Sequence, residues 1–173
     1  MSEFELYDRL LGLLDEKGVQ YRLIDHLPEG RTEIISPIRG NELGQAAKCM
    51  VVMVKQGKKV TKYVLAVIPG DRKVDLNAIK LLLRGTYVSF ANPEIAERLA
   101  GSVVGTVLPI SFNTDLELIV DEELLTRNEE LYFNAARLDR SMVLRSVDYR
   151  SVVNPRIERI VQFADVDNSA SGS

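Results

Sequence analysis

The sequence has few of the side chains that enzymes use for nucleophilic or metal chemistry. Its 173 residues include one cysteine, one histidine and no tryptophan. A single cysteine excludes an internal disulfide, and one thiol with one imidazole is too few for a zinc site. A nucleophilic pair of Cys49 and His26 is formally open, but Cys49 stands in an apolar stretch, where cysteine usually acts as a small buried hydrophobe. We therefore expect neither a metal nor a cofactor.

Long apolar runs are absent as well. None reaches the roughly 20 residues that a membrane span requires, and the acidic start, MSEFE, is unlike a secretory signal. These absences predict a cytoplasmic protein that does not contact a membrane. Hydrophobic content of 46% and charged content of 27% are ordinary for a globular protein. We expect a single domain over 1–164 and a disordered polar tail over 165–173.

Positive charge is concentrated in one segment of a mildly acidic chain. Seven of the eight lysines fall between Lys48 and Lys80, although the net charge is −3. The window from Lys48 to Arg84 holds nine basic and two acidic residues, a balance of +7. Such a concentration of charge suits a polyanion better than a neutral metabolite.

Periodicity and turn signals predict an α+β fold with a mixed, curled sheet, because strands and helices do not alternate strictly. A Ser2–Glu5 capping box opens a first helix that ends before Gly18. Further helices are expected after Asp75, after Asn92 and over 148–153, with short broken helix and turns over 32–44. Strands are expected over 19–26, 47–55, 62–68, 87–90, 103–107, 116–120, 131–134 and 142–145.

Lys48 opens the apolar strand expected over 47–55. In a strand it shares a face with Met50, Val52 and Val54, and since both faces are apolar we expect the strand to be central. Two interpretations stay open. The lysine is a cation placed at a cavity to hold a phosphate, or its stem covers apolar surface while its head stays in water.

A second group of lysines marks the turn between the expected strands 47–55 and 62–68. Because no acidic residue lies among them, they could attract a nucleic acid backbone, although many such clusters are simply solvated. Tyr63 is the one aromatic residue close by, so the aromatic platform typical of single-strand binders is missing. The group consists of Lys55, Lys58, Lys59 and Lys62.

Two further features have a functional and a structural interpretation each. The stretch from Gly101 to Pro109 is an apolar run with glycines, which let backbone N–H groups approach a ligand and stabilise an oxyanion; alternatively it is a tight turn. His26, at a strand end, is a pocket residue or a structural one. The acids at 121–123 and 129–130 are expected to form a solvated face.

With these residues in view, the chain resembles the family of YbaK and prolyl-tRNA synthetase-associated editing domains, which are aminoacyl-tRNA deacylases. The likeness extends from about residue 6 to 153 and is strongest to the YeaK-like branch. It is carried by HLPEG at 26–30, QAAKC at 45–49 and VIPGDRKVDL at 67–76. Lys48 matches the family's lysine at the start of a central strand, and Gly105 to Pro109 matches its G-x-x-x-P loop.

The resemblance implies a curled, partly barrel-like mixed sheet flanked by helices, and a trans-editing hydrolase that acts on mis-acylated tRNA. It implies that Lys48 holds the terminal nucleotide near its phosphate and that the Gly105 backbone orients the aminoacyl carbonyl. The ribose 2′-hydroxyl then helps to activate water. The implied partners are aminoacyl-tRNA and, as an optional second partner, an aminoacyl-tRNA synthetase. The substrate-binding residues that we expect are Thr106, Pro109, Asn134 and His26.

The sequence departs from YbaK itself at positions that can tune specificity. Cys49 stands where YbaK has threonine, Ser141 where it has aspartate, and the positions near Ile24 and Thr32 also differ. We therefore expect a small aliphatic or hydroxyl amino acid in place of cysteine. Two alternatives stay open: a non-catalytic tRNA- or RNA-binding module, and a small-molecule ester hydrolase or regulatory partner of a synthetase.

Overall fold

The computed structural model describes residues 3–163, and the predicted α+β class is confirmed there. The helices are α1 (Glu3–Glu16), α2 (Thr32–Arg39), the short 3-10 helix η1 (Leu43–Gln45), α3 (Leu76–Leu82), α4 (Pro93–Ala100), α5 (Glu122–Arg127) and α6 (Ser146–Val153). The strands are β1 (Tyr21–Asp25), β2 (Ala47–Gln56), β3 (Val60–Pro69), β4 (Tyr87–Phe90), β5 (Leu116–Asp121), β6 (Glu130–Asn134), β7 (Arg140–Arg145) and β8 (Arg156–Glu158).

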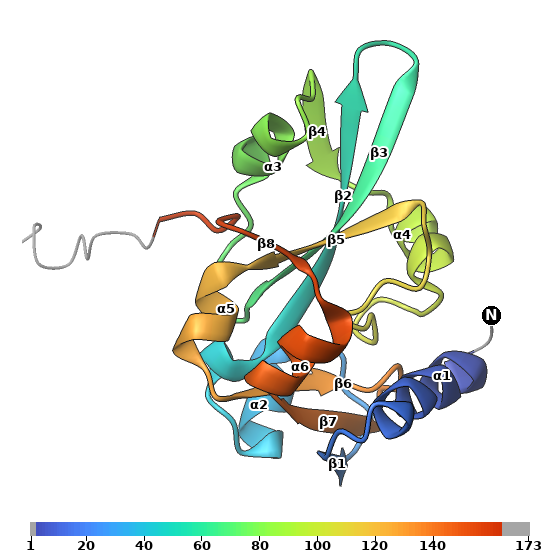
Figure 1. Ribbon diagram of the computed structural model, residues 1–173, viewed down its shortest axis with the longest axis vertical. Coiled ribbons are helices and arrows are strands. Elements are labelled where there is room, and N and C mark those ends of the chain that lie inside the picture. The colour runs from blue at the N-terminus through green and yellow to red at the C-terminus, as the bar shows by residue number, and fades with distance from the viewer. Residues whose placement is uncertain (1–2, 164–173) are drawn as a thin grey trace, which may run out of the picture.

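The strands form two sheets, and neither closes into a barrel. The larger sheet has the order β4-β2-β3-β5-β8, and the smaller has the order β1-β7-β6. The larger sheet is mixed, because β5 runs parallel to both β3 and β8 while the other pairs are antiparallel. An isolated bridge between Ala46 and Tyr132 links the start of β2 to the smaller sheet. Figure 1 shows the turn of the β2–β3 hairpin at one end of the molecule, with β4 beside it.

The β2–β3 hairpin is the element that positions the candidate site. Its two ten-residue strands pair from Ala47↔Pro69 to Gln56↔Val60. Both faces of β2 are covered, since Val52 packs in one apolar cluster and Val51 in another, which confirms the prediction of a central strand. On its other side β2 pairs with β4 only from Val52 to Lys55. The stretch 47–50 therefore has one edge that β4 does not cover.

Helix termini follow the predicted signals where the structure describes them. The Asp75 carboxylate accepts a hydrogen bond from Ala78 N at 3.0 Å, and Asn92 Oδ1 accepts one from Glu94 N at 2.8 Å. Each bond satisfies an amide at the start of a helix. The Ser2 half of the predicted capping box and the predicted tail over 165–173 lie outside the described residues. No helix within residues 3–163 is long and apolar enough to cross a bilayer.

Two local predictions were wrong. The stretch 103–107 forms turns rather than a strand, because Gly105 has φ +91° and interrupts the extended backbone. Of the acids at 121–123, Asp121 does not belong to a solvated face, whereas Glu122 is exposed and Glu123 is partly exposed. Asp121 is fully buried, where its carboxylate accepts hydrogen bonds from Ile160 N and Glu123 N, and α5 begins directly after it.

Candidate functional site

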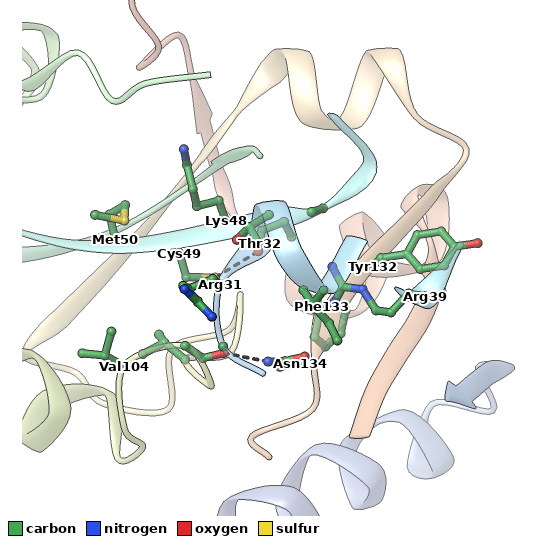
Figure 2. A pocket seen from close by; sticks show the side chains of 16 residues that line it. Arg31, Thr32, Arg39, Lys48, Cys49, Met50, Val104, Tyr132, Phe133 and Asn134 are labelled. Carbon is green, nitrogen blue, oxygen red and sulfur yellow. Dashed lines mark hydrogen bonds between the residues drawn. The ribbon is translucent and has the colours of Figure 1, made fainter. Parts of the chain in front are cut away.

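A cavity of about 210 Å³ lies beside the start of β2. It is enclosed by the loop before α2, by the inner face of α2, by the Gly105 turn and by the end of β6 (Figure 2). Lys48, Gly105 and Asn134 all line it, so the fold brings together three of the predicted site residues from distant parts of the sequence. The lining residues are 30–32, 35, 39, 46–50, 104, 105, 107 and 132–134.

Lys48 occupies the rim of this cavity. Figure 2 shows its side chain extending from β2 on the side away from Asn134. The ammonium is half-buried and donates a hydrogen bond to the Arg72 carbonyl at 2.7 Å. Burial lowers the pKa of Lys48, while the carboxylates of Glu33 and Asp71 act in the opposite direction. The lysine is thus neither free in solvent nor paired directly with a carboxylate.

The segment that carries the Arg72 carbonyl is fixed to α5 by ion pairs. The Arg72 guanidinium donates to Glu123 Oε1 at 2.7 Å, and Arg127 forms a two-pronged ion pair with Asp71. These contacts give the Pro-Gly-Asp-Arg-Lys motif a structural role, since they hold the acceptor that orients Lys48.

The Gly105 turn forms the opposite wall, and only glycine suits its position. Its φ of +91° is disfavoured for side chains, and an added Cβ would lie 2.7 Å from Gly30 Cα. Asn134 Nδ2 donates to both Gly105 O and Glu29 O, at 2.9 Å each, and so clamps the two loops together. Within the described residues the Gly105 N–H makes no hydrogen bond.

A buried polar network supports Asn134 from behind. Ser141 Oγ donates to Asn134 Oδ1 at 2.9 Å and lies 2.7 Å from His26 Nε2. Arg39 Nη1 donates to the same hydroxyl at 3.2 Å. His26 therefore lies in the supporting network rather than on the cavity wall, with Nδ1 donating to the Leu27 carbonyl.

Arg39 is the functional candidate that sequence reasoning missed. Its side chain lines the cavity although the residue is only 8% exposed, and no carboxylate of residues 3–163 forms an ion pair with it. Burial lowers its pKa to about 10. An uncompensated cation in such a place is costly unless other polar groups satisfy it, and here Asn41 Oδ1 accepts from Arg39 Nε at 3.0 Å. No local pattern indicates this role, because an arginine in the last turn of a helix is common.

Thr106 and Pro109 lie behind the wall rather than on it. The Thr106 hydroxyl is buried and donates to Val103 O at 2.7 Å, and the Pro109 carbonyl accepts a hydrogen bond from the Tyr149 hydroxyl. Neither residue lines the cavity. Both fix the loop that carries Gly105.

Cys49 lines the cavity, but its thiol is not activated. Burial raises the pKa of the thiol, which keeps it protonated, and Sγ donates a weak hydrogen bond to Ala47 O at 3.6 Å. Since the His26 ring is engaged by Leu27 and Ser141, the two residues do not form a nucleophilic pair. Within residues 3–163, no group of three or more His, Cys, Asp or Glu side chains is arranged to hold a metal ion.

The hairpin lysines are exposed and lie away from the cavity. Lys55 is seven residues further along β2 than Lys48, a separation of roughly 23 Å at the usual rise of a strand, and the others follow at or beyond the turn. The Lys55 ammonium lies 5.9 Å from the centre of the Tyr87 ring. A ligand that touched both Lys48 and this hairpin would have to be large. The other three lysines are Lys58, Lys59 and Lys62.

The Asn134 clamp gives a first prediction. Asn134→Asp keeps the size of the side chain but removes both amide donors, so the carbonyls of Glu29 and Gly105 would face a carboxylate. Leaving such buried groups unsatisfied should lower the free energy of unfolding by about 2–4 kcal/mol, measurable by urea denaturation. Ser141→Ala is the matched control, because it removes a support of Asn134 and leaves the donors in place. Equal stability of the Asn134→Asp variant and the wild type would contradict the clamp.

Comparison with known proteins gives matches over most of the chain. The family model named aminoacyl-tRNA editing domain matches residues 33–152. The multifunctional Ser/Thr-tRNA deacylase ProXp-y of Escherichia coli strain K12 is 37% identical over 151 residues, which cover 87% of this chain and 90% of that protein.

Two solved structures share the fold. The hypothetical protein APE2540 aligns with a TM-score of 0.78 and 19% identity, over 88% of this chain and 99% of that one. The crystal structure of a putative trans-editing enzyme for prolyl tRNA synthetase aligns with a TM-score of 0.73 and 22% identity, over 91% of this chain and 97% of that one.

Proposed function

Because this chain belongs to the aminoacyl-tRNA editing domain family, we propose that it removes wrongly attached amino acids from tRNA in the cavity between Lys48 and the Gly105 turn. Its substrate is aminoacyl-tRNA, and the bond that breaks is the ester between the amino acid and the terminal ribose. The observation that carries the proposal is the placement of Lys48 and Gly105 on one small cavity.

Each wall of the cavity has a task in this proposal. The Lys48 ammonium, fixed by the Arg72 carbonyl, holds the phosphate of the terminal nucleotide at the rim. The amino acid enters the cavity, where the unpaired Gly105 N–H is available to the ester carbonyl. As water attacks the carbonyl carbon, charge develops on that oxygen, and a preorganised backbone donor stabilises it.

The remaining proton transfers fall to the substrate. The ribose 2′-hydroxyl, next to the ester, positions the attacking water, as the family resemblance implies. Collapse of the tetrahedral intermediate breaks the bond to the ribose oxygen, which takes up a proton, and a free amino acid and tRNA are released. Holding the ester and water in place contributes several kcal/mol to such a reaction. The protonated Cys49 thiol takes no part as a nucleophile.

The cavity favours a small amino acid. Its volume of about 210 Å³ suits a short side chain, and the name of the Escherichia coli relative specifies serine and threonine. We infer the same preference for this protein, in agreement with the predicted small aliphatic or hydroxyl substrate. The test is a panel of tRNAs charged with alanine, serine, threonine, cysteine and proline. Release of serine and threonine is the expected outcome, whereas binding without release from any of them would favour a non-catalytic tRNA-binding module.

The hairpin lysines give a prediction about salt. If they contact the tRNA backbone, changing all four lysines (55, 58, 59 and 62) to alanine should weaken tRNA binding at low salt. It should also reduce the slope of log affinity against log salt by up to about 3, because each phosphate contact contributes roughly 0.7–0.9. Filter binding between 50 and 200 mM salt measures both. Lys17→Ala, outside the basic window, is the control. An unchanged slope in the fourfold variant would show that the hairpin is merely solvated.

A cytoplasmic location is part of this proposal, since aminoacyl-tRNA is made and consumed where translation takes place. A synthetase remains an optional partner. Pull-down of a synthetase with the purified protein, with and without tRNA, would test it.

A further inference from the structure

A second cavity, of about 460 Å³, lies next to the first. It is bounded by β2, by the end of β4 and by the segment that leads into α3, which lies beside β4 in Figure 1. Lys48 and Met50 line both cavities, so the two spaces meet at the stretch of β2 that β4 leaves uncovered. A ligand that extends beyond the first cavity past Lys48 can therefore enter the second.

An aromatic ring forms one wall of this second cavity. Phe90 pairs with Val52 across β2 and β4, and residues directly opposite in a sheet point to the same face. Val52 in turn shares its face with Met50 and Lys48, which lie two and four residues before it in the strand. Phe90 is 48% exposed, so part of its ring is open to a ligand. This supplies the aromatic platform that the sequence around the hairpin lacks.

The charged groups of the cavity are arranged for an anion. Lys73 and Lys48 both line it, and the two cations lie close enough for Lys73 to help lower the pKa of Lys48. The one acid on the wall, Asp75, is engaged at the start of α3 through Ala78 N. Exposed aromatic surface beside cations fits a nucleotide, whose base stacks and whose phosphate is held by charge.

We propose that the second cavity binds the penultimate nucleotide of the tRNA 3′ end, with Phe90 stacking on its base and Lys73 contacting its phosphate. This rests on the proposed function, which places the aminoacylated terminal nucleotide at Lys48. Consecutive nucleotides of a single strand then occupy consecutive cavities along β2. Every tRNA ends in the same single-stranded CCA sequence, so the subsite reads no tRNA identity and serves to align the ester.

Two substrates of different length distinguish an effect on binding in the second cavity from an effect on ester hydrolysis in the first. One is seryl-adenosine, the ester of the terminal nucleoside alone. The other is the seryl ester of the CCA trinucleotide. Phe90→Ala should lower kcat/KM on the trinucleotide about 10-fold, within the range of roughly 5- to 100-fold expected for one stacked base. On seryl-adenosine it should have no effect, because that substrate cannot reach the second cavity.

Matched variants sharpen the experiment. Phe90→Tyr keeps the ring and should retain the activity of the wild type on both substrates. Tyr87→Ala removes an exposed ring from the opposite face of the same strand. It should leave kcat/KM unchanged on both substrates. Lys73→Ala should make kcat/KM on the trinucleotide less dependent on salt. The slope of log kcat/KM against log salt should fall by about 0.7–0.9, the contribution of one phosphate contact. Thermal unfolding of each variant confirms that the fold is intact.

The possible failures are distinguishable. If the wild type hydrolyses both esters and Phe90→Ala changes neither, the subsite is wrong and the proposed function stands. The subsite is equally wrong if Phe90→Ala lowers the rates on both substrates by the same factor, because the ring would then support the first cavity. If the wild type hydrolyses neither of these esters and no aminoacyl-tRNA of the panel, the proposed function itself fails.

Discussion

Lys48→Met should abolish most of the deacylase activity while leaving the fold intact. Methionine retains the apolar stem that packs on β2 but removes the ammonium at the rim. Loss of one charge that is half-buried and holds a phosphate costs about 2–5 kcal/mol, so kcat/KM should fall by roughly 30- to 5,000-fold. Release of serine from seryl-tRNA and urea denaturation measure the two effects.

The control for this variant is Lys80→Met, which removes the same charge from the basic window but lines neither cavity. It should keep nearly full activity. The pH profile offers a second readout. Because burial lowers the pKa of Lys48, the charged form is lost as pH rises through that lowered value, and enzymatic activity, corrected for spontaneous ester hydrolysis, should fall with it. Near-normal turnover of Lys48→Met would remove the basis of the mechanism.

Gly105→Ala should reduce activity about 100-fold. The new Cβ would meet Gly30 Cα at 2.7 Å, so the two loops must separate, and the backbone N–H that the proposed reaction uses would move with the turn. Loss of one donor to an oxyanion costs about 10²–10³ in kcat. The positive φ adds a stability cost of about 1–3 kcal/mol. Steady-state kinetics on seryl-tRNA and thermal unfolding measure the two effects.

Gly101→Ala is the control for Gly105→Ala. It introduces the same backbone strain without the close contact to another loop. Gly101 has a similar φ of +77°, but nothing lies within 4 Å of an added Cβ. It should therefore lose stability by a comparable amount and keep its activity within a few-fold. If both variants lost activity equally, strain in the loop would be the cause, and the close approach to Gly30 would have no special role.

The β2–β3 hairpin was predictable because its signals are local. An apolar run on each side of Gln-Gly-Lys-Lys specifies two strands and a turn, and a strand that is apolar on both faces has to be central. The same applies to the helices capped by Asp75 and Asn92. The stretch 103–107 was misjudged for the opposite reason. Its valines favour a strand, but the tertiary contact of Gly105 with Gly30 imposes a turn.

Asp121, the residue before α5, and the cation Arg39 show a second limit of local signals. Whether a charge is solvated depends on what packs against it, and residues far apart in sequence decide that. Asp121 is buried because Ile160 N and Glu123 N satisfy its carboxylate. Arg39 is buried because Ser141 and Asn41 accept its donors.

The sequence by itself determined the class of fold, the family and the two residues, Lys48 and Gly105, on which the proposed reaction depends. All three could be predicted from periodicity, turn chemistry and the order of motifs, because these signals depend on residues that are close together in the sequence. Only the tertiary structure decided that His26, Thr106 and Pro109 stand behind the wall, that Asn134 clamps two loops, and that Phe90 lies beside a second cavity. Such facts depend on strand register and on the packing of distant segments, which no local pattern encodes.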